Sequence, residues 1–121
     1  MHDKKIPKSR VTRLDPVIGD NVRRLREGRG WTQPILADRM EVSLSLLSQL
    51  ETGHKPWNSS TIVAACDALG VDAVHLFGGA MLTAQEAKSL TLIRALHEAE
   101  TKEREYAQQL GLKPSEKKPD A

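Results

Sequence analysis

The chain has 121 residues, the size of one small domain with an appendage, which excludes a second large hydrophobic core. Its single cysteine, Cys66, excludes an intramolecular disulfide framework and the usual multi-thiolate zinc site. No stretch approaches the roughly eighteen apolar residues of a membrane span, and the first ten residues lack the apolar segment of a signal peptide. We therefore expect a cytoplasmic protein without membrane contact.

The aromatic content and the distribution of charge indicate the fold class and the kind of partner. Only four aromatic residues are present, so the core must consist mainly of Leu, Ile, Val, Ala and Met, as in small all-α domains. Residues 1–30 hold nine basic and four acidic residues, whereas the seven basic and seven acidic residues from Thr83 onward balance. A basic N-terminal segment suggests that the protein binds a polyanion, although flexible basic termini also occur for solubility alone.

The first helix is predicted to follow an irregular segment. Residues 1–14 have many charges and no apolar periodicity, which predicts a flexible basic arm. Asp15 is expected to cap the following helix, Pro16 suits its first turn, and Gly28 ends it. The apolar face of this helix is expected to hold Ile18, Val22 and Leu25.

Two short helices come next. Thr32 is the expected N-cap of a helix that runs to about Met40 and tolerates Pro34 in its first turn. Ser43 is expected to cap a helix that ends at Gly53. The expected buried positions are Leu36, Ala37 and Met40 in the first of these helices and Leu46, Leu47 and Leu50 in the second.

A fourth helix is predicted from "SSTIVAACDALG", with Gly70 as its terminal glycine, and a short fifth helix from about Asp72 to Phe77. Ile62, Cys66 and Leu69 are expected to face inward. Five helices in so few residues predict a compact all-α domain over residues 15–79.

A long C-terminal helix is predicted within residues 82–111, followed by a disordered tail over residues 112–121. Its apolar stripe consists of Leu92, Leu96, Ala99, Tyr106 and Leu110, widened by Leu90 and Ile93 and interrupted by Glu103. A single helix cannot bury such a stripe on itself. The helix therefore either forms a homodimer with a second subunit or packs across its own domain.

Two short helices joined by a three- to four-residue turn are typical of the helix-turn-helix motif, in which the second helix enters the major groove of DNA. Residues 18–77 resemble the Xre-type (phage-repressor and Cro-like) helix-turn-helix regulators. The residues that carry the resemblance are "IGDNVRRLREGRGWTQ", the Leu36–Ala37 and Val42–Ser43 pairs, "LSQLETG" and "TIVAACDALGV". The resemblance implies a five-helix, lambda-repressor-like DNA-binding fold. The sequence departs from the family at Glu41, where the turn usually has a small residue or glycine.

The exposed side of the second helix of this motif, about residues 43–52, is uncharged. It presents Ser43, Leu44, Ser45, Ser48 and Gln49. Glutamine can pair bidentately with adenine, serine can bond several bases, and leucine can pack on a thymine methyl group. The resemblance implies that Leu44, Ser45 and Gln49 read the bases. The alternative is an uncharged face that only contacts solvent.

Phosphate contacts must supply much of the affinity for DNA, because neutral base contacts release no counterions. The resemblance places one such contact at Gln33, and charge alone suggests Arg24, His54 and Lys55. The resemblance also implies a buried ion pair between Arg26 and Glu51 that orients the reading helix.

These features predict a sequence-specific DNA-binding regulator, a repressor, which binds a palindromic operator in double-stranded DNA as a homodimer through residues 82–111. We expect it in the cytoplasm, associated with the nucleoid. The alternative is the antitoxin of a toxin–antitoxin pair, with the long helix and tail contacting a protein partner. No nucleophile–base pair, phosphate loop or metal-ligand spacing indicates an enzyme, a cofactor or a metal.

Overall fold

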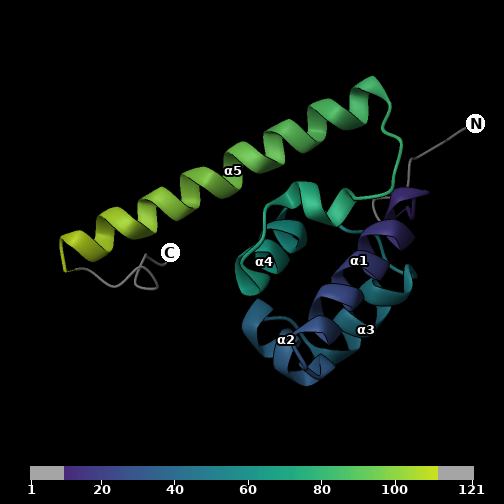
Figure 1. Ribbon diagram of the computed structural model, residues 1–121, viewed down its shortest axis with the longest axis horizontal. Helices are drawn as coiled ribbons and strands as arrows, with labels where there is room; N and C mark the ends of the chain where they lie inside the picture. The colour runs from purple at the N-terminus through teal and green to yellow at the C-terminus, as the bar shows by residue number, and fades with distance from the viewer. Residues whose placement is uncertain (1–9, 112–121) are drawn as a thin grey trace, which may run out of the picture.

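The computed structural model describes residues 10–111 and is all-α within them. Its elements are α1 (Leu14–Gly28), α2 (Gln33–Met40), α3 (Leu44–Thr52), α4 (Ser59–Leu69), the 3₁₀ helix η1 (Ala73–Phe77) and α5 (Ala84–Gln109). Helices α1 to α4 and η1 form a small domain, and α5 runs past α4 so that its last turns extend beyond that domain (Figure 1). The predicted fold class is confirmed. The expected tail and residues 1–9 of the expected arm lie outside the described residues.

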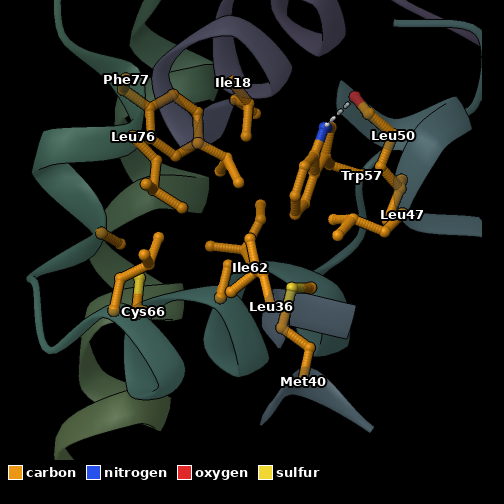
Figure 2. Packing of buried hydrophobic residues seen from close by; sticks show 14 of the residues in the cluster. Ile18, Leu36, Met40, Leu47, Leu50, Trp57, Ile62, Cys66, Leu76 and Phe77 are labelled. Carbon is orange, nitrogen blue, oxygen red and sulfur yellow. Dashed lines mark hydrogen bonds between the residues drawn. The ribbon is translucent and has the colours of Figure 1, made fainter. Parts of the chain in front are cut away.

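The core fills the space between α1, α2, α3, α4 and η1 (Figure 2). Its largest fully buried side chains are Val22, Leu36, Leu47, Leu50, Cys66 and Leu76. Burying one leucine contributes about 1.5–3 kcal/mol to stability. Burial raises the pKa of the Cys66 thiol to about 12, so this side chain stays protonated near neutral pH and packs as a small apolar group.

The predicted bounds and caps of α2 and α3 are confirmed. Helix α2 follows Thr32 and buries the three predicted residues, although the Thr32 side chain makes no capping hydrogen bond. The Ser43 hydroxyl accepts a hydrogen bond of 3.0 Å from the amide of Leu46, and Gly53 ends α3 in the left-handed region. Both helices are short, so these local signals decide where they begin and end.

The expected N-cap of α1 is wrong. The N-cap position is Arg13, two residues earlier, so the helix begins at Leu14 and Asp15 lies buried in its first turn. The Asp15 carboxylate accepts hydrogen bonds from the amides of Thr12 at 2.7 Å and Trp57 at 2.8 Å. Asp15 thus joins the start of α1 to the loop before α4, a distant partner that local sequence signals do not reveal.

The Trp57 side chain makes a second link, between the loop before α4 and helix α3. Its ring is buried, and its Nε1–H donates to the carbonyl oxygen of Leu50 at 3.1 Å (Figure 2). An indole N–H needs such a partner when it leaves water. Trp57 therefore ties the loop after α3 to α3 itself.

The turn between α2 and α3 takes a left-handed conformation at Glu41, with φ 61° and ψ 42°. A residue with a Cβ pays a conformational penalty there. The amides of Glu41 and Val42 donate to the carbonyl oxygens of Asp38 and Ala37, which closes α2 within one turn. Glu41 thus occupies the left-handed position of this turn, and α3 starts only three residues later.

Gly19 sets the distance between α1 and α3. A Cβ atom at this position would lie 2.7 Å from the carbonyl oxygen of Glu51 and closer still to that of Leu50. Both neighbours are backbone atoms of α3, which cannot rotate away. Only glycine therefore allows α3 to lie this close to α1.

Helix α5 attaches to the domain mainly through charged groups. Arg94 forms a two-pronged ion pair with Asp72 at 2.8 and 3.0 Å, and Arg104 pairs with Asp67 at 3.0 Å. The hydrogen bonds from Arg94, and next from the amide of Val74, lower the pKa of Asp72. The Arg94–Asp72 pair is therefore ionised at neutral pH and is lost when acid protonates Asp72.

The apolar contact of α5 with the domain is small. Leu90 is buried and Ile93 packs against the core, so these two residues do not widen the predicted stripe but lie on the opposite side of the helix. The stripe itself faces solvent, with Leu92 70% exposed and Tyr106 64% exposed. Among residues 10–111, no helix is both long and apolar enough to cross a membrane.

Candidate nucleic-acid interface

Helix α3 presents the candidate base-reading face. Leu47 and Leu50 are buried against the domain, which leaves the opposite side of α3 in solvent. Of the five residues predicted to contact bases, Ser43, Leu44, Ser45 and Gln49 are exposed and Ser48 is half-buried. This face contains no charged residue, so it can offer hydrogen bonds and apolar contacts to base edges.

One of these residues already has a structural role. The Ser43 hydroxyl oxygen accepts the capping hydrogen bond from Leu46, so Ser43 retains its O–H donor and one lone pair for contact with DNA. Leu44 begins the helix and is 47% exposed, with its side chain unsupported by the core. Gln49 lies one turn further along with its whole amide group available for a bidentate contact.

Thr52 belongs to the same face, which the sequence analysis missed. Three or four residues separate it from Ser48 and Gln49, so helical spacing places these side chains together. The Thr52 hydroxyl lies 3.0 Å from the carbonyl oxygen of Ser48 and 2.8 Å from Nδ1 of His54. A threonine four residues after Ser48 and three after Gln49, on an exposed helix face, was the available signal.

The predicted phosphate contacts fall into two groups. His54 and Lys55 lie exposed directly after α3, and the amide of His54 donates to the carbonyl oxygen of Gln49 at 2.9 Å. This bond fixes the start of the loop beside the reading face. By contrast, Arg24 lies on α1, where it pairs with Asp20 at 2.9 Å, and no described hydrogen bond or ion pair joins it to α2 or α3.

Gln33 lies half-buried at the start of α2, and its side chain is oriented by the domain. Its Nε2–H donates to Oε1 of Glu51 at 2.8 Å. The amide group retains a second N–H, and the backbone N–H groups of the first turn add the positive end of the helix dipole. The start of α2 can thus offer donors to a phosphate, with the Gln33 side chain held in place.

Arg26 and Glu51 form the buried centre of this arrangement. The guanidinium Nε lies 2.7 Å from Oε2 of Glu51 and Nη2 lies 3.0 Å from Oε1, while Nη1 donates to the carbonyl oxygen of Trp31 at 2.8 Å. Both side chains are more than nine-tenths buried. With the bond from Gln33, the cluster connects α1, the start of α2 and the end of α3, and so fixes the angle between the two helices of the motif.

Comparison with known proteins agrees with this geometry. Residues 17–76 match a family model described as a helix-turn-helix domain. The chain is 36% identical over 58 residues to a propionyl-CoA carboxylase regulator of Cereibacter sphaeroides and 38% identical over 56 residues to the HTH-type transcriptional regulator RamB of Mycobacterium tuberculosis. These alignments cover 48% and 46% of this chain but 13% and 12% of the two relatives, so the match spans only a small part of their length.

A solved structure matches over more of the chain. The clp gene regulator ClgR from C. glutamicum is 30% identical and superposes with a TM-score of 0.52. The superposition covers 60% of this chain and 99% of that structure. Both the sequence and the arrangement of helices are therefore similar to those of helix-turn-helix regulators.

Proposed function

The chain belongs to the Xre-type helix-turn-helix family of DNA-binding transcriptional regulators, and on this premise we propose that it binds a palindromic operator as a homodimer and represses transcription. The observation that carries the proposal is the uncharged, exposed face of α3, held at a fixed angle to α2 by the buried Arg26–Glu51 pair. A groove-reading helix needs both features, because it must offer neutral contacts to bases and must not tilt when it does so.

In the proposed complex α3 lies in the major groove and α2 crosses the backbone. Ser43, Leu44, Ser45, Ser48 and Gln49 contact the bases. Gln49 accepts from and donates to adenine, and Leu44 packs on a thymine methyl group. The exposure of Leu44 supports this role, because removing a large apolar side chain from water against a methyl group is favourable for binding.

Phosphate contacts supply the sequence-independent part of the affinity. We assign them to Gln33, His54 and Lys55, which flank α3, and to Arg24 on α1. Lys55 carries a full charge next to the reading face, so it contributes to the salt dependence of binding through counterion release. The helix start at Gln33 contributes donors without a full charge.

Dimerisation follows from the small size of the reading face. One helix contacts too few bases to specify an operator, whereas two copies related by a twofold axis read two half-sites about one helical turn apart. In this proposal residues 15–79 read DNA and residues 82–111 join the two copies. Occupancy of a promoter by such a dimer is enough for repression. The protein would then act on DNA in the cytoplasm.

Replacing Gln49 with alanine tests the reading face. On the DNA sequence that the wild-type protein prefers, Gln49→Ala is expected to weaken binding by about tenfold and to relax the preference at the base pair that Gln49 contacts. Fluorescence anisotropy with a panel of single-base changes measures both effects.

Gln108→Ala is the matched control, because Gln108 is an exposed glutamine near the end of α5, on the side opposite its apolar stripe. It should leave affinity and preference unchanged. If Gln49→Ala bound every duplex in the panel as the wild type does, α3 would not be the reading element.

A further inference from the structure

The outward side of α5 is an apolar stripe without a partner in the domain. We define the stripe as Leu92, Leu96, Ala99, Tyr106 and Leu110, which recur every three or four residues. The opposite side of α5 holds the groups that attach it to α4 and η1. Because ion pairs fix that opposite side, the stripe is held facing solvent over the length of the helix.

An exposed methionine, Met81, lies two residues before Thr83, the N-cap of α5. Its side chain is 86% exposed, the highest exposure among the large apolar residues of the described chain. The guanidinium of Arg13 donates to its carbonyl oxygen at 2.7 Å and to Oε1 of Glu86 at 2.6 Å. The backbone that carries this exposed methionine is therefore fixed to α1 and to the first turn of α5.

Two charged residues lie in line with the stripe, one in each half of α5. Lys88 precedes Leu92 by one turn, and Glu103 lies between Ala99 and Tyr106. Both side chains are exposed, and neither takes part in any ion pair described for residues 10–111. A partner surface that covers the stripe is therefore favoured if it offers a negative charge near Lys88 and a positive charge near Glu103.

We propose that the stripe binds the same stripe of a second copy in antiparallel orientation, with the twofold axis between Ala95 and Leu96. In this register Lys88 lies opposite the second copy's Glu103, because the two residues are equally far from the axis on opposite sides. For the same reason Leu92 faces Ala99 of the second copy. The contact defines the surface through which the proposed homodimer forms and rests on that proposed function.

Other pairings fit less well. A parallel pair would place Glu103 against Glu103 and Lys88 against Lys88, which are repulsive contacts. An antiparallel pair centred near Thr101 would face Glu103 with Ala99 and leave Glu103 without a basic partner. Of these pairings, only the register centred between Ala95 and Leu96 places each charge opposite its complement, and this self-complementarity indicates a second copy of the chain.

Charge reversal tests the register. Multi-angle light scattering at low ionic strength should give the wild-type chain twice its monomer mass of 13.4 kDa. Glu103→Lys and Lys88→Glu should each weaken dimerisation by about tenfold, because each creates two like-charge contacts across the twofold axis. The double variant, and an equimolar mixture of the two single variants, should dimerise as tightly as the wild type.

Glu105→Lys is the matched control, because Glu105 is exposed two residues further on but points away from the stripe. It should not change the dimerisation constant. Oxidation of Leu96→Cys should cross-link two copies at the axis, whereas Glu105→Cys should not cross-link, and the native Cys66 is fully buried.

These measurements distinguish a failure of the α5 register from a failure of the proposed DNA-binding function. A wild-type dimer that is equally stable in all variants would overturn the register, while binding to a palindromic operator would still support the homodimer. A wild-type chain that stays monomeric at all concentrations, or that associates only with a different protein, would overturn the contact with a second copy. Operator selection would then show whether DNA reading fails as well.

Discussion

Replacing Arg26 with alanine is expected to lower the free energy of unfolding by about 3–5 kcal/mol. The reason is the partner that remains: Glu51 would keep a buried carboxylate without its guanidinium, and the carbonyl oxygen of Trp31 would lose a donor. Urea denaturation followed by circular dichroism measures the change.

The control for this variant is Arg24→Ala. Arg24 is exposed and pairs only with Asp20 on its own helix among the described ion pairs, so its removal should cost less than about 1 kcal/mol. The account of the buried pair would be wrong if Arg26→Ala and Arg24→Ala unfolded at the same urea concentration.

Gly19→Ala is expected to destabilise the fold by about 3 kcal/mol, the upper end of the usual cost of overpacking. The added Cβ would overlap the carbonyl oxygens of Leu50 and Glu51, and backbone atoms cannot move aside without shifting α3. Because α3 is the proposed reading helix, the same variant should also bind DNA more weakly under conditions where it remains folded. Thermal unfolding and DNA titration measure the two effects.

Gly28→Ala provides the comparison, since a Cβ atom at the end of α1 would meet nothing within 4 Å. Alanine favours helix over glycine by up to about 1 kcal/mol, so this variant should be as stable as the wild type or slightly more stable. Equal stability of the two alanine variants would show that α1 and α3 do not approach as closely as described.

The parts of the fold that depend on local signals could be predicted from the sequence. Serine at the start of α3, glycine at its end and the spacing of Leu36, Ala37 and Met40 gave the right bounds and buried positions. Such caps and periodic positions involve residues within one or two turns of each other, so a sequence displays them directly.

The parts that depend on distant partners could not be predicted. Asp15 resembled a helix cap, but its carboxylate bonds the amide of Trp57. Gly19 appeared to be an ordinary helix residue, and only the packing of α3 shows why no side chain fits there. In α5 the periodicity revealed the stripe but not that charged residues on the other side attach the helix to the domain.

In the candidate site, too, some features follow from local sequence spacing and others depend on distant contacts. The exposure of Leu44 and Gln49 follows from the burial of Leu47 and Leu50, which helical spacing predicts. The bond from Gln33 to Glu51 and the contact of Thr52 with His54 depend on how α2, α3 and the next loop meet. These contacts decide which side chains are oriented before DNA arrives.

The most direct test of the central claim is selection of bound sequences from random duplex DNA by the full chain. We expect an inverted repeat whose half-sites are centred about one helical turn, roughly 34–36 Å, apart. Binding that is weak, falls steeply with salt and shows no sequence preference would contradict it, because phosphate contacts alone would then explain the affinity.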